Sequence, residues 1–270
     1  MKVQSDTDLH VTLRGVKKVF HAEQGDVHAL GPIDLDLRRG EFYAVVGPSG
    51  CGKSTLLELL AGLSSVTEGD IRFEGQPIGG DIPDGVGVVF QEDACFPWLN
   101  VSQNIAFGLE QRRTPAALQD ELLAHALGVM GLEAFAKSYP SQLSGGMRQR
   151  VCIARTLVLQ PRLILLDEPF GALDQQTRLL MGEELLKLWR DTGATVFLIT
   201  HALDEAAMLA DRIGVMSARP GRLLETVSTG WPVDRDSRIV ESPEFGQVTA
   251  RLWQRLREES MKSIGKEKRA

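Results

Sequence analysis

Residues 47–55 read Gly47-Pro48-Ser49-Gly50-Cys51-Gly52-Lys53-Ser54-Thr55, between an apolar segment at 44–46 and a leucine-rich segment at 56–61. A strand, a glycine-rich turn and a helix in this order match the phosphate-binding loop pattern G-x-x-x-x-G-K-[ST]. The glycines leave backbone N–H groups open to phosphate oxygens, and the helix directs its positive dipole end toward the same place. Lys53 supplies a charge for the β- and γ-phosphates, and Ser54 supplies a hydroxyl for Mg²⁺. All nine residues are therefore predicted to form a nucleoside triphosphate site, and the flanking segments disfavour a chance glycine-rich turn.

The bulk composition is that of a folded globular chain. With 270 residues, 43% of them hydrophobic, the chain can form one large domain or a domain with an insertion. A net charge of −6 argues against a nucleic-acid partner held by bulk electrostatics. Cys51, Cys95 and Cys152 lack metal-ligand spacing, which suits a reducing cytosol. No stretch approaches the roughly 20 apolar residues that span a bilayer, and residues 1–10 lack a secretory segment. A membrane role would therefore need another chain to supply the spanning part.

Apolar segments alternate with helix-forming ones along most of the chain. We expect strands at residues 11–19, 27–37, 44–46, 69–75, 86–90, 163–166, 195–199, 213–216 and 223–227. We expect helices at residues 56–61, 100–109, 115–127, 144–159, 174–192 and 243–258. All-apolar strands between helices indicate a parallel sheet that is covered on both faces.

The predicted fold is α/β, with a P-loop NTPase core, a mixed or parallel sheet and a peripheral antiparallel β subdomain. Residues 9–227 form this core, and a helical subdomain of about residues 92–160 is inserted in it. Residues 228–270 form a C-terminal extension, with a short helix and, from Lys262 onward, a mobile charged tail.

Polar residues follow the ends of four predicted strands. The phosphate loop follows Val46, Gln91 follows Phe90, Asp167-Glu168 follows Leu166, and Thr200-His201 follows Ile199. In an open parallel sheet, ligands bind beyond the carboxyl ends of the strands. We therefore expect these four strand ends to form one site.

Each of these polar residues has an expected role in nucleotide chemistry. Asp167 would hold Mg²⁺ together with Ser54, and Gln91 would bind Mg²⁺ or the attacking water through its amide oxygen. Glu168 would orient and deprotonate that water, the alternative for the acidic pair being a helix cap. His201 would donate to the γ-phosphate, the alternative being a structural histidine.

Two further stretches have more than one interpretation. Phe96-Pro97-Trp98 is either a small core cluster or an exposed apolar anchor for a partner. In residues 143–150, LSGGMRQR, Ser144 caps a helix whose first turn carries Gly145 and Gly146, so a phosphate could approach that helix N-terminus closely. Two copies that face each other, each lending this turn to the other's nucleotide, would use both anion sites. The alternative is an ordinary capped helix with glycines for close packing.

Together these stretches resemble the ATP-binding cassette of ABC transporters. The resemblance rests on residues 47–55, 143–150, LILLDEP at 163–169, ALD at 172–174 and His201, and it covers about residues 10–227. It implies ATP and Mg²⁺ as cofactors, a D-loop that contains Asp174, and Phe20 stacked on adenine. It also implies that residues 95–99 lie near the groove for a permease's coupling helix. Met147 stands where many cassettes have Gln.

Within that family, three stretches are similar to the nitrate, sulfonate and taurine importers, namely residues 96–99, 104–109 and 217–222. Cys95 and Phe96 stand where that group more often shows two leucines. The resemblance implies an ATP-hydrolysing subunit that dimerises, as a homodimer, around two Mg·ATP at the cytoplasmic face of the membrane. Its partners would be permease subunits and, indirectly, a solute-binding protein, with no nucleic acid.

Two other functions stay open for the same motifs. A soluble ABC ATPase acting in DNA repair or translation usually carries a coiled-coil insertion or two cassettes in one chain, and this sequence has neither. A P-loop small-molecule kinase would leave Ser144-Gly145-Gly146 unexplained.

Cys51 is expected to be a nucleotide-guarded thiol. It lies beside Lys53 and near a helix N-terminus, and both features favour the thiolate. We therefore expect a maleimide to label Cys51 first and Mg·ATP to slow the labelling. Cys95 and Cys152 show no such electropositive setting in the sequence.

Overall fold

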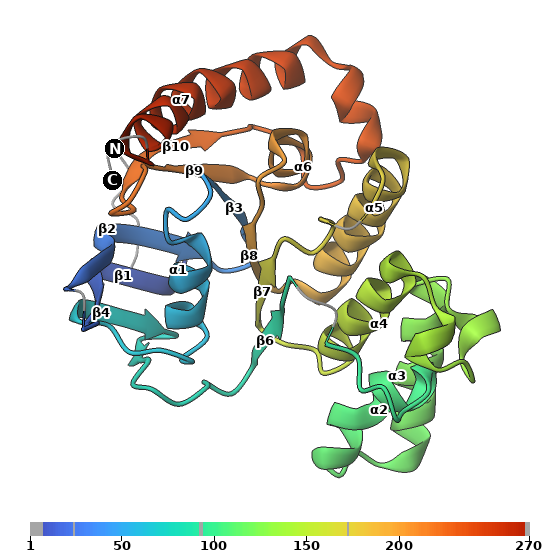
Figure 1. The fold of residues 1–270 in the computed structure, drawn as a ribbon. Helices are drawn as coiled ribbons and strands as arrows, with labels where there is room; N and C mark the ends of the chain where they lie inside the picture. Colours follow the sequence, from blue (N-terminus) through green and yellow to red (C-terminus); the bar gives the residue numbers. More distant parts are fainter. Residues whose placement is uncertain (1–7, 24, 92–93, 172, 268–270) are drawn as a thin grey trace.

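A six-stranded sheet, ordered β10-β9-β3-β8-β7-β6, forms the centre of the computed structural model, which describes residues 8–23, 25–91, 94–171 and 173–267 (Figure 1). Its strands are β3 (Phe42–Val46), β6 (Val86–Val89), β7 (Leu163–Asp167), β8 (Thr195–Ile199), β9 (Arg212–Met216) and β10 (Leu223–Ser228). All neighbours pair in parallel except β10, which is antiparallel to β9. Every residue of β3, β7 and β8 is buried, so the predicted sheet covered on both faces is confirmed.

The edge strand β6 differs from the sequence-based expectation of a buried strand. Only Val89 is fully buried there, because β7 is its one neighbour in the sheet. A Cβ atom at Gly87 would lie 2.7 Å from the Thr156 side chain, so the following helical layer packs directly on the β6 backbone.

A second sheet, ordered β2-β1-β4-β5, lies beside the first and is antiparallel. It consists of β1 (Leu9–Phe20), β2 (Val27–Arg38), β4 (Glu68–Phe73) and β5 (Gln76–Pro77). Helix α1 (Lys53–Leu60) packs between the two sheets, and its leucines join a core cluster with Val11 of β1 and with Tyr43 and Val45 of β3. Alternate residues of β3, such as Phe42 and Ala44, face the other core cluster, as strand geometry requires.

The helical block consists of α2 (Val101–Gln111), η2 (Glu133–Phe135), η3 (Pro140–Gln142), α3 (Ala116–Val129) and α4 (Gly145–Leu157). The Asn100 side chain accepts a hydrogen bond from the Gln103 N–H at 2.9 Å, and the Gln103 side chain accepts one from the Asn100 N–H at 3.0 Å, so the predicted capping box is confirmed. Asn104 is fully buried and hydrogen-bonds both Phe96 N and Phe96 O, at 2.8 and 3.1 Å. The loop before α2 is therefore held in one shape by α2 itself.

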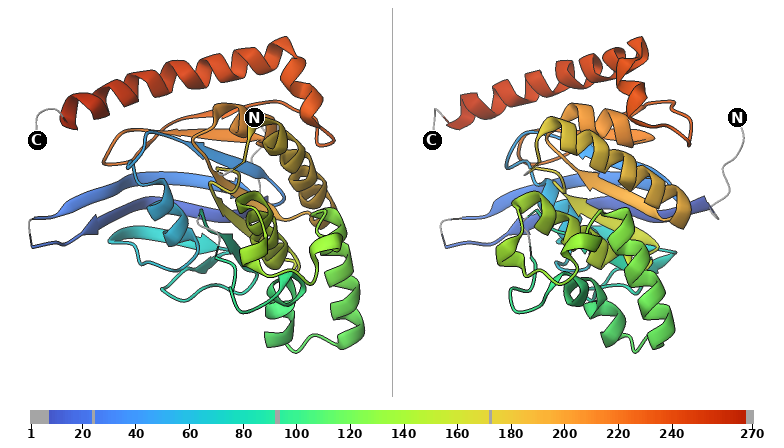
Figure 2. Two further views of the ribbon diagram at one scale, coloured as in Figure 1. Left: turned by 45° about the vertical axis from the view of Figure 1, so that its right-hand side comes forward. Right: turned by 90° about the vertical axis from the view of Figure 1, so that its right-hand side faces the viewer.

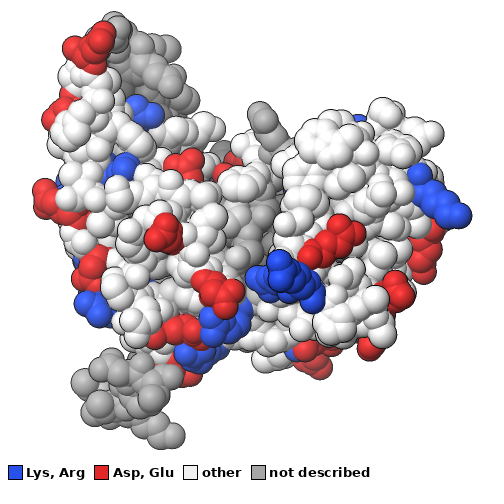
Figure 3. Space-filling view, turned by 90° about the horizontal axis from the view of Figure 1, so that it is seen from below, with Lys and Arg blue, Asp and Glu red and all other residues white. Residues whose placement is uncertain are grey.

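Helices α5 (Gln175–Thr192) and α6 (Leu203–Leu209) cover the face of the central sheet opposite α1. Helix α5 begins at its N-cap Asp174 and ends, as expected, at Gly193, which has the left-handed conformation. On the face shown in Figure 3, Lys and Arg side chains lie interspersed with Asp and Glu side chains.

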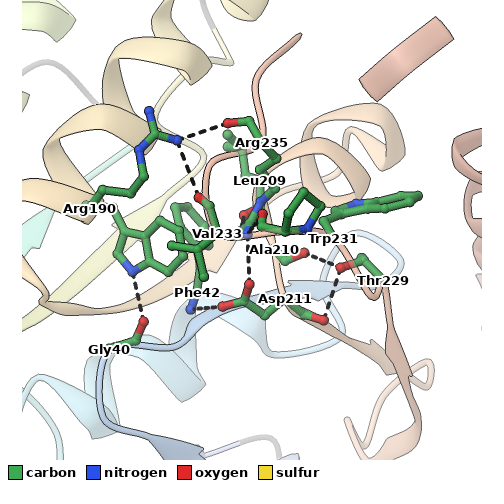
Figure 4. Close-up of polar contacts among 12 residues, drawn as sticks. Gly40, Phe42, Arg190, Leu209, Ala210, Asp211, Thr229, Trp231, Val233 and Arg235 are labelled. Carbon is green, nitrogen blue, oxygen red and sulfur yellow. Dashed lines mark hydrogen bonds and ion pairs between the residues drawn. The ribbon is translucent and has the colours of Figure 1, made fainter. Parts of the chain in front are cut away.

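The C-terminal extension is anchored in the core rather than simply appended to it (Figure 4). Arg235 is 3% exposed, donates to Asp211 Oδ1 at 2.8 Å, and lies over the Trp189 ring at 4.8 Å. Trp231 Nε1 donates to the Ala207 carbonyl oxygen at 2.7 Å, and the Thr229 hydroxyl donates to the Ala210 carbonyl oxygen at 2.8 Å. The extension is therefore continuous with the core from its first residues.

After η4 (Ser237–Glu241), helix α7 (Pro243–Glu267) runs along the outside of α6 and β9 (Figure 2). It is longer than the expected helix of residues 243–258, and the expected mobile tail from Lys262 is helical as far as Glu267; residues 268–270 lie outside the described residues. The helix packs on the core as far as Glu259. Phe245, Leu252 and Leu256 are buried, and the Ala218 N–H donates to Glu259 Oε2 at 2.9 Å. No helix in the described part of the chain has the length and apolarity that a membrane span needs.

Candidate active site

A pocket of about 610 Å³ opens beyond the carboxyl ends of the central strands. It is lined by Phe20, Val27, Ala29, Ser49, Gly50, Gly52, Lys53, Ser54, Thr55, Gln91, Glu168, His201 and Arg219. The tertiary structure thus brings together residues after four strands with Phe20, which lies at the end of β1 in the other sheet.

The loop between β3 and α1 has the shape of an anion site. Gly52 has a φ of 104°, and a Cβ atom there would lie 2.9 Å from the Ala29 carbonyl oxygen, so the position requires glycine. No side chain caps α1, which leaves its first N–H groups available. Lys53 Nζ donates to the carbonyl oxygens of Gly47 and Pro48, at 2.9 and 3.1 Å. A cation and uncapped N–H groups at one helix N-terminus suit a phosphate.

Asp167 lies at the end of β7 with one carboxylate oxygen unpartnered. The side chain is 8% exposed, and its Oδ1 is buried without a hydrogen-bond partner. Burial raises the pKa of Asp167, a hydrogen bond with Ser54 opposes that rise, and Glu168 adds to it. A buried, unsatisfied carboxylate oxygen beside a hydroxyl fits a hard cation such as Mg²⁺, which prefers oxygen ligands.

Glu168 contacts the residues that follow strands β6 and β8. Its Oε2 accepts a hydrogen bond from Gln91 Nε2 at 3.1 Å and lies 3.1 Å from His201 Nδ1. The Glu168 backbone has a φ of 47°, which is uncommon for a residue with a side chain, and its N–H donates to the Ile199 carbonyl oxygen at 2.9 Å. The fold therefore holds this carboxylate at the pocket wall, where it can accept a proton from a water molecule.

Glu205 supports this arrangement from α6 and was not predicted from the sequence. It is 7% exposed, and the Thr200 hydroxyl donates to its Oε2 at 2.8 Å, directly before His201. The pKa of Glu205 is raised to about 7: burial is the main cause and the Glu168 charge adds to it, while the Thr200 hydrogen bond and Arg178 oppose the rise. In the sequence, Asp204-Glu205 resembles an ordinary acidic helix start, so no signal distinguished it.

We expect Glu205→Gln to change how stability depends on pH. Because the folded-state pKa of about 7 exceeds the ordinary value of 4.5, the wild type loses stability as pH rises through this range. The loss should approach about 3 kcal/mol. The amide does not titrate, so the stability of the variant relative to that of the wild type should rise between pH 5 and pH 8. Denaturant unfolding at both pH values measures this.

The matched control for this experiment is Asp204→Asn, one residue earlier and exposed. It should leave the pH dependence of the wild type unchanged. A stability difference between wild type and Glu205→Gln that is the same at both pH values would contradict the assignment.

Arg219 is a second pocket residue that the sequence analysis did not place there. It comes from the turn between β9 and β10, and its Nε donates to the Gly50 carbonyl oxygen at 3.3 Å. In the sequence, residues 217–222 contribute only to the family resemblance, and no spacing rule links them to the phosphate loop. Val27 and Ala29 of β2 also line the pocket, because the fold places the second sheet beside the phosphate loop.

Several predicted site residues lie outside the pocket lining. Gly47, Pro48 and Cys51 belong to the loop but do not line the pocket, and Asp167 lies behind Ser54. The Ser144-Gly145-Gly146 turn starts α4, where Ser144 Oγ accepts from the Met147 N–H at 3.3 Å. Asp174 caps α5 by accepting from the Thr177 N–H at 3.0 Å. One copy of the chain therefore does not bring the two anion sites together.

The expectation of a reactive Cys51 thiol is wrong. Cys51 is 1% exposed and belongs to the core cluster around α1. Burial raises the pKa of its thiol, and this effect outweighs the opposing one of Lys53. Sequence adjacency to Lys53 could not show that the sulfur points into the core, so early maleimide labelling is no longer expected.

Comparisons with known proteins agree with the geometry of the site. A protein-family model described as ABC transporter matches residues 30–171. The chain is 44% identical to a taurine import ATP-binding protein of Roseobacter denitrificans, covering 87% of this chain and 90% of that relative. It is 40% identical to a nitrate import ATP-binding protein of Synechocystis sp., covering 92% and 96%.

A solved structure is similar over most of the fold. It is a dimeric ATP-binding cassette in a post-hydrolysis state with ADP and Pi bound, 31% identical, with a TM-score of 0.73 over 81% of this chain and 98% of that one. The resemblance inferred from the sequence motifs is thereby confirmed. The chain belongs to the ABC transporter family, as one of its ATP-binding proteins.

Proposed function

We propose that this chain hydrolyses ATP and thereby powers a separate membrane permease that imports a small solute such as a sulfonate, taurine or nitrate. The observation that carries hydrolysis is the Glu168 carboxylate, held at the pocket wall by contacts with Gln91 and His201. The names of the taurine and nitrate import relatives support the direction of transport and the class of solute.

The pocket residues divide the work of binding. Phe20, 42% exposed at the pocket rim, stacks on adenine. The N–H groups of the loop and the Lys53 ammonium bind the phosphates. Asp167 and Ser54, with Gln91, would hold Mg²⁺, which would supply positive charge against that of the phosphates.

Hydrolysis then needs a general base for the attacking water and a hydrogen-bond donor at the γ-phosphate. Glu168 orients the attacking water and takes its proton, because among the described residues it is the one carboxylate that lines the pocket. His201 lies beside Glu168 and donates to the γ-phosphate as negative charge develops on it. Gln91 contacts Glu168, so the segment that follows Gln91 responds to the contents of the pocket.

A second copy of the chain completes the site. The Ser144 turn and Asp174 lie away from the pocket of their own copy, and an antiparallel arrangement of two copies would bring them to the partner's nucleotide. The dimeric cassette with ADP and Pi supports this arrangement by similarity. We propose a homodimer, because one chain supplies both halves of the site.

The surface for the permease is the loop before α2. Trp98 is 70% exposed and stacks on Phe96 with ring centroids 5.5 Å apart, and Phe96 packs on Phe107 at 4.8 Å. Asn104 fixes the loop backbone, so the ring is presented at little entropic cost. A docked permease would place the chain at the cytoplasmic face of the membrane, and a solute-binding protein would act through that permease.

We expect Trp98→Ala to abolish co-purification with a membrane-spanning chain. An affinity-tagged wild type, extracted from membranes in mild detergent, should bring down a multispanning protein that mass spectrometry identifies. Because Trp98 is mostly exposed, the variant's melting temperature should fall by less than about 2 °C.

Trp253→Ala is the matched control, because Trp253 is 61% exposed on α7, away from this loop. It should retain the membrane-spanning partner. A steep loss of stability in Trp98→Ala, of the ~3–5 kcal/mol typical of a core aromatic, would instead favour a core role. Equal recovery of the partner by both variants would refute the proposed docking surface.

A further inference from the structure

Two cysteines far apart in the sequence meet between the loop before α2 and helix α4. Cys95 Sγ and Cys152 Sγ lie 3.5 Å apart, although 57 positions separate them in the chain. A disulfide has an S–S distance of about 2.05 Å, so an approach of about 1.5 Å would form the bond. Figure 1 shows α4 and α2 side by side in the helical block, where this loop also lies.

The two sulfurs differ in their exposure and in the atoms that surround them. Cys95 is partly exposed, and its Sγ lies 3.4 Å from the Arg148 carbonyl oxygen. Cys152 is 4% exposed, and Arg155 Nη2 lies 3.9 Å from its Sγ. The Arg155 guanidinium gives this buried sulfur a cationic neighbour. The sequence-based expectation that Cys152 lacks an electropositive setting is therefore wrong, because one helical turn separates it from Arg155.

The Arg155 guanidinium is fixed in place by other contacts. Its Nη1 donates to the Ala94 carbonyl oxygen at 2.9 Å, and it lies over the Phe96 ring at 4.8 Å. Arg155 therefore links helix α4 to the loop before α2, the two segments that a Cys95–Cys152 disulfide would join. The loop and α4 are therefore held together at the place where a disulfide would join them.

We propose that Cys95 and Cys152 form a redox modification site that hydrogen peroxide or another hydroperoxide closes to an intrachain disulfide. The Cys95 thiolate, the more accessible, attacks a peroxide oxygen, the O–O bond breaks, and Cys95 becomes a sulfenic acid. The Cys152 thiolate then attacks the Cys95 sulfur and expels hydroxide, which is protonated to water. In sum, two thiols and one hydrogen peroxide give one disulfide and two waters: the sulfurs lose two electrons and the peroxide gains them.

The bond would link two parts of the proposed site. The loop that contains Cys95 follows Gln91, which contacts Glu168, and α4 begins at the Ser144 turn. In the reduced protein the connection at this place is non-covalent, for example the hydrogen bond that Gln149 Nε2 donates to the Phe90 carbonyl oxygen at 3.4 Å. A covalent link would restrict movement of the Ser144 turn relative to Gln91. We infer that the disulfide slows ATP hydrolysis and that reduction restores it, a consequence that rests on the proposed function.

The test uses the full-length protein, treated with hydrogen peroxide, quenched with N-ethylmaleimide and digested without reductant. The expected result is a Cys95–Cys152 cross-linked peptide, with a mass lower by two hydrogen atoms in the intact protein and restored by dithiothreitol. Hydrolysis should slow several-fold on oxidation and recover on reduction. Cys152→Ala should instead accumulate sulfenic acid at Cys95, which dimedone traps, and neither Cys95→Ala nor Cys152→Ala should show the reversible slowing.

Absence of the cross-linked peptide in the folded wild type, or a cross-link that involves Cys51 instead, would overturn the proposed site. A complete cross-link that leaves hydrolysis unchanged would overturn the inferred effect of the bond. The mass readout does not depend on ATP. If the reduced protein fails to hydrolyse ATP, the proposed function fails, while the cross-link still decides the redox site. Melting curves of both single variants verify that they are folded.

Discussion

Glu168→Gln should lower ATP hydrolysis by roughly 10²–10⁴-fold, the usual contribution of general-base catalysis, while ATP still binds. The amide has the shape of the carboxylate but cannot take a proton from water. It can still contact Gln91 and His201, so the pocket wall should be preserved. With hydrolysis blocked, the ATP-bound dimer should accumulate. Phosphate release, nucleotide binding and size-exclusion chromatography with ATP and Mg²⁺ measure the three effects.

Glu121→Gln, on the exposed surface of α3, is the matched control and should hydrolyse ATP like the wild type. A rate for Glu168→Gln near that of the wild type would remove Glu168 from the role of base. Weak ATP binding by the variant would instead show that the carboxylate supports the pocket rather than the chemistry.

Heterodimers that carry Lys53→Ala in one subunit and Gly145→Asp in the other should hydrolyse ATP, although neither variant alone should. If each nucleotide lies between Lys53 of one subunit and the Ser144 turn of the other, both lesions fall on the same site. The second site of the heterodimer is then intact, and its rate should reach up to about half that of the wild-type dimer. Removal of one preorganised phosphate donor costs about 10²–10³-fold, so each pure variant should be nearly inactive.

The structure selects Gly145 over Gly146 for this experiment. A Cβ atom at Gly146 would lie 2.5 Å from the Leu173 side chain, whereas at Gly145 the nearest atom is the Arg148 guanidinium at 3.8 Å. An aspartate at position 145 therefore adds a charge without an obligatory clash inside its own copy. Such a charge repels phosphate at the helix N-terminus.

The control carries both substitutions in one subunit and pairs it with a wild-type subunit, with heterodimers isolated through two different tags. Each composite site then contains one lesion, so this heterodimer should be inactive. A site confined to one subunit predicts the opposite order, because the wild-type subunit would remain intact. Equal rates for the two kinds of heterodimer would contradict the composite site.

Much of the fold followed from local patterns. The all-apolar segments around Leu163–Leu166 and Thr195–Ile199 predicted buried parallel strands, because a strand covered on both faces has no polar position to offer. The capping box at Asn100 fixed the start of α2. Helix α7 is longer than expected, and the shared face of its buried residues Phe245, Leu252 and Leu256 becomes evident only against α6 and β9.

By itself, the sequence determined the phosphate loop, the polar residues after the strands and the family, because each depends on neighbouring residues or on strand order. The convergence of Gln91, Glu168 and His201 could be predicted, since parallel strands place their carboxyl ends at one edge. Only the tertiary structure decided the orientation of side chains whose contacts come from distant segments. It turned the Cys51 sulfur into the core, brought Arg219 to the loop, and raised the pKa of Glu205 by burial. These properties depend on solvent exclusion and on contacts between distant segments, which no local pattern records.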